Sequence, residues 1–151
     1  MRKITPFLWF DHEAEEAMNF YVSIFKNSKA GPVSRMPDGT ASSVSFTIEG
    51  QDFLALNGGP TYKFTPAVSL FVDCVDQREV DELWSKLLSG GGKEDRCGWL
   101  TDRYGLSWQI IPKALGELMG DPDPVKAGRV MQAMMGMVKI DVAALKKAHG
   151  G

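Results

Sequence analysis

The spacing of hydrophobic and polar positions changes repeatedly along the first 112 residues, and the changes predict one element order that occurs twice. Apolar residues at helical spacing predict amphipathic helices over residues 13–26 and 76–89. Apolar or alternating stretches predict strands around each helix. These strands cover residues 4–10, a short run ending at 36, 43–48, 53–56, 67–72, 93–102 and 106–111. The order is therefore βαβββ, followed by βαβββ.

A fixed offset between the two halves supports an internal duplication. Residues 8–11 precede residues 70–73 by 62 positions, and both segments are apolar and end in aspartate. With one inserted residue, the apolar positions of the two helices also coincide. We therefore expect an α+β fold with a single domain over residues 1–112, built from modules at about 1–60 and 66–112. Its mixed sheet should curve around a cleft, with both helices on the convex face.

Local signals predict where the helices begin and how the chain continues after the second module. Asp76 and Glu79 have capping-box spacing, and Asp11 or His12 is expected to cap the first helix. Residues 113–151 form a helical tail, interrupted at 121–124 and again at 139–141, where Asp141 should cap the last helix. Its stripe contains the adaptable side chains Met131, Met134 and Met137. We expect this tail to pack on the domain or on a partner chain.

Composition narrows the class of protein without identifying a ligand. The 151 residues include 17 basic and 19 acidic ones, so the net charge of −2 does not favour binding to nucleic acid or to an anionic membrane. No apolar run approaches the roughly 20 residues of a membrane helix. Two cysteines are too few for a disulfide scaffold. We expect a cytoplasmic protein with no membrane or nucleic-acid partner.

Alternation along the strands predicts two different sheet faces. One is wholly apolar and should lie under the helices; it carries Val44, Phe46, Ile48, Leu54, Leu56, Val68, Leu70, Val72, Trp108 and Ile110. The other is mixed and carries Leu8, Phe10, Ser43, Ser45, Thr47, Asn57, Ser69, Phe71, Ser107 and Gln109. Apolar walls with a few hydroxyl and amide groups are typical of small-molecule pockets. The alternative is a face that is solvated or filled by another chain's tail.

Four segments together resemble a known family. They are residues 6–17, 53–60, 129–141 and, above all, the sequence CGWLTDRYGLSWQIIP at 97–112. These segments resemble the PhnB-like branch of the vicinal oxygen chelate superfamily, the group of glyoxalases, bleomycin-resistance proteins and extradiol dioxygenases. Members of this branch often carry the label 3-demethylubiquinone-9 3-methyltransferase. The resemblance implies the glyoxalase-like fold and a homodimer.

The resemblance also implies where a metal would bind, because metal enzymes of the superfamily take ligands from the first and last strands of each module. Those positions fall on Pro6, about Ala55, Ala67 and Gln109. Only Gln109 offers a donor, and its neutral carbonyl is a weak one, so we expect no bound metal. The chain also lacks a Gly-rich turn after the first strand of a doubly wound sheet, so we expect no S-adenosylmethionine and no other cofactor.

No catalytic group can be assigned from the sequence. Cys97 is the one plausible nucleophile, but neither histidine, His12 or His149, is placed to act as its base. A buried and inert thiol is the competing interpretation. Asp73 and Asp102 follow strands and could act as acid or base, although carboxylates there are commonly solvated or capping.

The leading hypothesis is a metal-free small-molecule binding protein, or an enzyme of unknown reaction, that forms a homodimer. The expected ligand contacts are Phe10, Ser45, Asn57, Ser69, Phe71, Trp99 and Gln109, with Gln109 deepest. One alternative is a metal-dependent lyase, isomerase or dioxygenase. Another is a dimeric scaffold that acts through the Met-rich tail. The identity of the ligand cannot be deduced from these residues.

Overall fold

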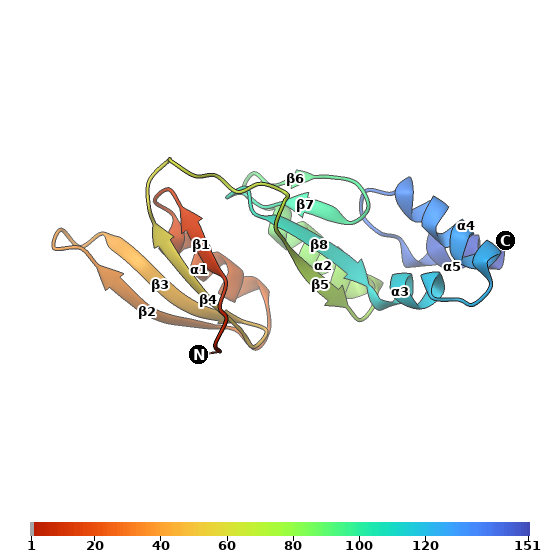
Figure 1. Ribbon diagram of the computed structural model, residues 1–151, viewed down its shortest axis with the longest axis horizontal. Coiled ribbons are helices and arrows are strands. Elements are labelled where there is room, and N and C mark those ends of the chain that lie inside the picture. Colours follow the sequence, from red (N-terminus) through yellow and green to blue (C-terminus); the bar gives the residue numbers. More distant parts are fainter. Residues whose placement is uncertain (1) are drawn as a thin grey trace. The chain divides into compact units, whose positions relative to one another are not determined.

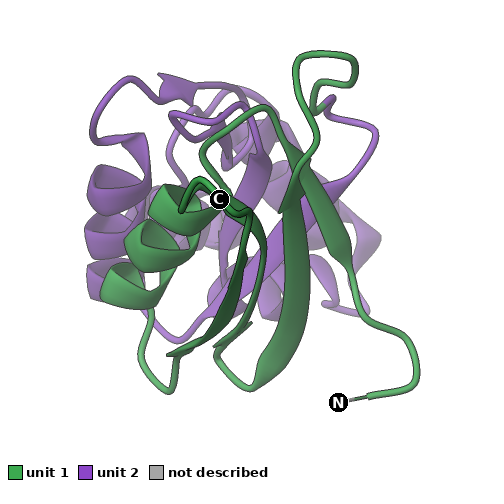
Figure 2. Cartoon of the chain, turned by 90° about the vertical axis from the view of Figure 1, so that its left-hand side faces the viewer, with its two compact units in different colours: residues 1–64 green, residues 65–151 purple. Residues whose placement is uncertain are grey.

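The computed structural model describes residues 2–151, and the chain divides into two compact units. Unit 1 is Met1–Phe64 and unit 2 is Thr65–Gly151, coloured separately in Figure 2. Within the described residues, no helix combines the length and apolar character needed to cross a membrane. Each unit contains one of the two predicted modules.

Unit 1 is a four-stranded mixed sheet with one helix (Figure 1). Its elements are β1 (Phe7–Phe10), α1 (Ala14–Ile24), β2 (Lys29–Arg35), β3 (Ala41–Ile48) and β4 (Gln51–Asn57). The spatial order is β1-β4-β3-β2, and β1 pairs with β4 in parallel, whereas the other pairs are antiparallel. The first strand therefore lies beside the last one of the module.

Unit 2 repeats this topology and adds the tail. Its sheet contains β5 (Ser69–Cys74), β6 (Lys93–Glu94), β7 (Trp99–Thr101) and β8 (Ser107–Pro112), with α2 (Gln77–Leu88) between β5 and β6. The order β5-β8-β7-β6, with β5 parallel to β8, matches unit 1 and confirms the predicted βαβββ repeat. The strand ladders of the described residues form two four-stranded sheets, where we expected a single sheet.

The predicted faces are correct for β8 and wrong for β1 and β4. In unit 2, Trp108 and Ile110 are buried on the side of α2, as expected. In unit 1, however, Phe53 and Ala55 are the buried residues of β4, so Leu54 and Leu56 lie on the opposite face. Both faces of β4 are apolar, so alternation alone could not choose between them. The small side chains of Ala55, Ala14 and Ala17, all fully buried, let α1 approach the sheet closely.

The starts of the two helices are stabilised in different ways. Asp76 caps α2 by accepting a hydrogen bond from the Glu79 amide at 3.0 Å, which confirms Asp76 as the residue that starts this helix. The first helix does not use Asp11 or His12. Instead, Asn57 Oδ1 accepts from the Ala14 amide at 2.8 Å, and Asn57 Nδ2 donates to the Ala41 carbonyl at 3.0 Å. The cap of α1 therefore comes from β4, far away in sequence.

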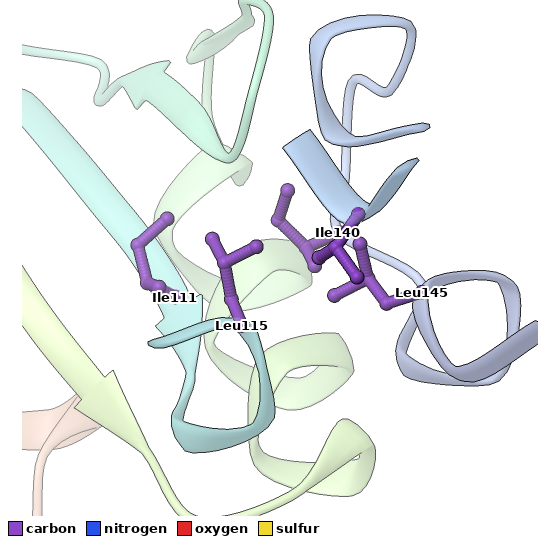
Figure 3. Close-up of a cluster of buried hydrophobic side chains, with 5 residues drawn as sticks. Ile111, Leu115, Ile140 and Leu145 are labelled. Atoms are coloured by element: carbon purple, nitrogen blue, oxygen red, sulfur yellow. The ribbon is translucent and has the colours of Figure 1, made fainter. Parts of the chain in front are cut away.

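The tail forms three helices within unit 2: α3 (Lys113–Met119), α4 (Pro124–Met135) and α5 (Val142–Gly150). They enclose an apolar cluster of Ile111, Leu115, Val130, Ile140 and Leu145 (Figure 3). Asp141 caps α5 as predicted. The side chain of Gln77 on α2 donates to the Ile140 carbonyl and accepts from the Val142 amide, at 2.9 and 2.7 Å. The tail is therefore fixed to the second module.

The turn between β7 and β8 is organised by one buried carboxylate. Asp102 is 3% exposed, and its Oδ1 accepts from the amides of Tyr104 and Leu106 at 2.9 and 3.1 Å. Its Oδ2 accepts from the indole nitrogen of Trp108 at 2.9 Å. Charge-assisted bonds of this kind compensate for the cost of burying a carboxylate. Asp102 thus has a structural role in the segment that resembles the family most closely.

Replacing Asp102 should therefore destabilise unit 2 strongly. We expect Asp102→Ala to lower the free energy of unfolding by about 3 kcal/mol or more, because three donors, two of them in buried hydrogen bonds, lose a charged acceptor. Asp102→Asn should have a smaller effect, since it keeps one acceptor oxygen. Chemical denaturation measures both, with Glu16→Ala on the exposed side of α1 as the control. A change below 1 kcal/mol, on the scale of about one ordinary hydrogen bond, would contradict this structural role.

Candidate functional site

The predicted site residues of unit 1 do not share one face. Phe10 pairs with Asn57, and Phe10 is only 2% exposed, with its ring at 5.3 Å from that of Phe64. Both polar atoms of the Asn57 side chain are already hydrogen-bonded: Oδ1 caps α1, and Nδ2 donates to the Ala41 carbonyl. Ser45 pairs with Leu54 on the opposite face. The expectation that Phe10, Asn57 and Ser45 lie on one face is therefore wrong.

We call the sheet face opposite the helix of each unit its outer face. In unit 1 this face carries Phe7 and Trp9, which sequence reasoning missed, beside Leu54, Leu56 and Ser45. Phe7 is 56% exposed, whereas the Trp9 indole donates to the Gly59 carbonyl at 2.9 Å. This outer face is apolar along β1, whereas β3 contributes the hydroxyl side chains of Ser43, Ser45 and Thr47.

The predicted site residues of unit 2 lie together on one outer face. Gln109 is the register partner of Phe71 on β5 and of Trp99 on β7, so the three side chains form one row across the sheet, here called the ring row. Phe71 is 59% exposed, although it is a large apolar side chain. The register also shows that Trp99 shares the face of Gln109.

A second row of hydroxyl side chains lies beside the ring row. Ser107 is the register partner of Ser69 and of Thr101, and these three residues form the hydroxyl row. The rows are linked by a hydrogen bond of 2.9 Å from Gln109 Nε2 to Ser69 Oγ. Ser107 is 1% exposed, and its hydroxyl has no hydrogen-bond partner. Sequence reasoning placed Ser107 on this face but did not include it among the ligand contacts.

The tail borders one end of this outer face. Ile111 follows Gln109 by two positions on β8, and its side chain belongs to the apolar cluster of the tail. Gly98, next to Trp99, lies so close to this cluster that a Cβ there would meet Ile111 Cδ1 at 2.7 Å and Ile140 Cγ1 at 3.0 Å. Its φ of 83° also favours glycine. The site thus adjoins a closely packed apolar wall.

The charged groups at the β5 end of the outer face are paired with each other. Asp73, two residues beyond Phe71 on β5, forms an ion pair with Lys113 at the start of α3. This pair raises the pKa of Lys113, because the carboxylate accepts its hydrogen bond and attracts its charge. Both side chains are about half exposed. Asp73 is therefore engaged in an ion pair next to a site whose own side chains are uncharged.

The donor set does not fit the divalent metal of the superfamily's enzymes. Ala55 faces α1. In unit 1, Leu56 takes the place that Gln109 has in unit 2, because Leu56 pairs with Trp9 and Gln109 pairs with Phe71. Neither Ala55 nor Leu56 can ligate a metal. Across residues 2–151, no three His, Cys, Asp or Glu side chains are grouped so that they could hold an ion. We therefore derive no metal-assisted step.

A separate hollow of about 910 Å³ lies in unit 1 between α1 and the β2–β3 hairpin. Glu15 and Arg35 cross it with an ion pair of 2.7 Å, and Asn57 is part of its lining. Glu16 and His12 also line this hollow, so its lining contains several ionisable side chains and lacks the Phe and Trp rings of the unit 2 outer face. The outer face of unit 2 is the better candidate for an apolar ligand.

The two thiols occupy different environments. Cys74 is fully buried on β5, and burial, with the nearby carboxylates of Glu79 and Asp73, raises the pKa of its thiol to about 12. Cys97 is partly exposed in a turn with φ of 59°, and its sulfur lies 3.9 Å from the Met135 carbonyl oxygen. Cys97 is therefore partly accessible, and the alternative interpretation from the sequence, a buried thiol, does not apply to it.

This difference predicts selective alkylation. At pH 8 the folded protein should incorporate one equivalent of iodoacetamide at Cys97, while Cys74 stays protonated and inaccessible. Because the pKa of Cys74 is raised, increasing the pH toward that value would increase its thiolate fraction. Mass spectrometry with peptide mapping measures the sites, and Cys97→Ser and denatured protein are the controls. Labelling of Cys74 at an equal rate in the folded protein would contradict the expectation.

Comparisons with known proteins place this geometry in a family. The profile described as 3-demethylubiquinone-9 3-methyltransferase matches residues 2–111. The PhnB protein of Bacillus cereus, which carries the same methyltransferase name, is 37% identical, with a TM-score of 0.68 over 74% of this chain and 99% of that chain. A comparison with curated proteins gave no match.

More distant structures show the class of fold. A glyoxalase/bleomycin resistance protein of Albidiferax ferrireducens has a TM-score of 0.51 at 12% identity, over 72% of this chain and 96% of that chain. The fosfomycin resistance protein FosX of Listeria monocytogenes, solved with Mn(II) and sulfate, has a TM-score of 0.52 at 16% identity, over 72% and 90%. The fold is therefore glyoxalase-like. The chain belongs to the PhnB-like 3-demethylubiquinone-9 3-methyltransferase family.

Proposed function

We propose that this protein binds a small, mainly apolar molecule on the outer face of unit 2, without a metal. The observation that carries the proposal is the exposed ring of Phe71 beside the hydrogen-bonded pair of Gln109 and Ser69. An exposed aromatic surface next to convergent amide and hydroxyl groups favours a ligand with a ring and few polar atoms. Trp99 extends the aromatic surface on the other side of Gln109.

The methyltransferase name of the family is not the basis of this proposal. Methyl transfer from S-adenosylmethionine commonly uses a Gly-rich turn after the first strand of a doubly wound parallel sheet. Here β1 leads through Asp11 and His12 to α1, and each sheet, as described over residues 2–151, contains one parallel pair of strands among antiparallel ones. The quinone in the family name is compatible with the ring row, because a quinone is planar and mainly apolar. The proposal therefore retains ligand binding and leaves out methyl transfer.

The proposal predicts a defined effect of Gln109→Ala. A screen of small aromatic fragments by protein NMR should give hits that shift the signals of Phe71, Trp99 and Gln109. For such a hit, Gln109→Ala should weaken binding by roughly 1 kcal/mol, a change of about fivefold in Kd, because one buried hydrogen bond is lost. Gln132→Ala, on the exposed side of α4, is the matched control. S-adenosylmethionine should produce no shifts.

Two outcomes would contradict this function. The first is a screen in which no fragment shifts the outer-face residues of unit 2. The second is an unchanged Kd for Gln109→Ala with a fragment that is located there, provided that the variant keeps its melting temperature.

We also propose that the chain forms a homodimer through its tail. The observation that favours this is the exposure of large apolar side chains on and after α4: Met131 is 46%, Met135 59% and Val138 43% exposed. Methionine adapts its shape to a partner surface, and a two-fold dimer uses the same patch twice. Dimerisation through this surface is also what the alternative function, a dimeric scaffold that acts through its tail, would require.

The dimer is tested by sedimentation at micromolar concentration. We expect the mass of two chains, and we expect Met131→Gln with Met135→Gln to shift the equilibrium toward one chain, because the patch loses apolar area. Lys126→Gln on α4 is the control for a change of the exposed helix surface. A wild-type chain that sediments as a monomer would count against the proposal.

A further inference from the structure

The hydroxyl of Ser107 is the least satisfied polar group of the unit 2 outer face. It is 1% exposed, and no group within the described residues forms a hydrogen bond with its oxygen. A buried hydroxyl without a partner costs stability, so it requires a specific explanation. Ser107 lies two residues before Gln109 on β8, and side chains two residues apart in a strand point to the same face. The unpaired hydroxyl is therefore directed to the side of the candidate site.

The groups around Ser107 offer both hydrogen-bond donors and an acceptor. Gln109 uses one Nε2 proton on Ser69, which leaves its carbonyl oxygen Oε1 as an acceptor. Ser69 accepts that bond and keeps its own proton as a donor. Ser107 and Gln109 are roughly 6.6 Å apart along the strand, from two residues of about 3.3 Å each. A ligand carbonyl oxygen could accept a hydrogen bond from the Ser107 hydroxyl, and an adjacent N–H or O–H of the ligand could donate to Gln109 Oε1.

On the neighbouring strands β5, β8 and β7 the two rows contain no ionisable side chain, and Lys93, the register partner of Thr101, continues the hydroxyl row on the edge strand β6, two strands away from β8. Phe71, Gln109 and Trp99 form the ring row, and Ser69, Ser107 and Thr101 form the hydroxyl row. A carboxylate or an ammonium group placed there would lose hydration without an opposite charge. The neighbouring Asp73 and Lys113 are already paired with each other. An uncharged polar group is therefore favoured over a charged one.

From these observations we infer that the outer face of unit 2 takes an uncharged planar ligand whose carbonyl oxygen binds the Ser107 hydroxyl and whose adjacent N–H or O–H binds Gln109. This inference rests on the proposed function, because it names the class of ligand for the same site. Primary aromatic amides and hydroxy-substituted aromatic carbonyl compounds belong to this class. Ser107 is then a specificity-determining residue of the site.

Three probes of nearly equal shape test the inference on the full-length protein. Naphthalene-2-carboxamide has both a carbonyl and N–H groups, methyl naphthalene-2-carboxylate keeps a coplanar carbonyl without an N–H, and naphthalene-2-carboxylate is charged. Titration is followed by the NMR signals of Phe71 and Gln109. We expect the carboxamide to bind at least tenfold more tightly than either other probe. Equal binding of the carboxylate would overturn the inference.

Variants of Ser107 separate a role in ligand binding from a role in folding. Ser107→Ala should weaken carboxamide binding about fivefold, while the melting temperature of the free protein stays the same or rises, because an unpaired buried hydroxyl is removed. Ser107→Cys keeps a side chain at this position with a weaker donor and should give an intermediate Kd. Ser23→Ala, an exposed serine on α1, is the matched control. Unchanged carboxamide binding in Ser107→Ala, or a fall of several degrees in its melting temperature, would overturn the inference.

The probe titrations and the fragment screen distinguish a failure of the inferred ligand class from a failure of the proposed function. A carboxamide that fails to shift Phe71 and Gln109 overturns the inference, whereas fragments of other chemistry that bind there would still support the proposed function. If neither the probes nor the fragment screen shift these residues, both are overturned.

Discussion

The parallel pairing of the first and last strands in each module is the constraint on which the structure depends. A parallel pair cannot be closed by a tight turn, so the chain must cross over, and the helix of each module forms part of this crossover. The helix covers one sheet face, and the last strand becomes central, with β8 between β5 and β7. Five of the six residues of β8 are buried as a result. Gln109, the exception, lies in the middle of the outer face.

The turn before β8 fixes how that central strand presents its side chains. Asp102 ties the turn amides to the indole of Trp108, which lies on the helix side of β8. Because side chains alternate along a strand, holding Trp108 on one face holds Ser107 and Gln109 on the other. Within the segment 97–112, the hydrogen bonds of Asp102 thus hold residues 102–108 in place. The same segment contains Trp99, Ser107 and Gln109, the residues that we propose to contact the ligand.

The tail lies beyond the part of the chain that the family profile matches. The family match ends at residue 111, and 74% of this chain accounts for 99% of the Bacillus cereus protein. The tail packs on Ile111 and is fixed to α2 through Gln77. Since Ile111 follows Gln109 on the same face, the tail affects the surroundings of the candidate site.

The sequence by itself determined the element order, the duplication, the tail helices and the caps at Asp76 and Asp141, because each follows from local periodicity or short-range spacing. It also gave the correct outer face for β8, where apolar and polar residues alternate clearly. Only the tertiary structure decided the faces of β1 and β4, because apolar residues occupy both faces of β4 and the strand register selects between them. The α1 cap by Asn57 and the unpaired hydroxyl of Ser107 also depend on groups brought together from distant positions. Local pattern fixes which elements form, whereas pairing and close packing decide which side chains they present.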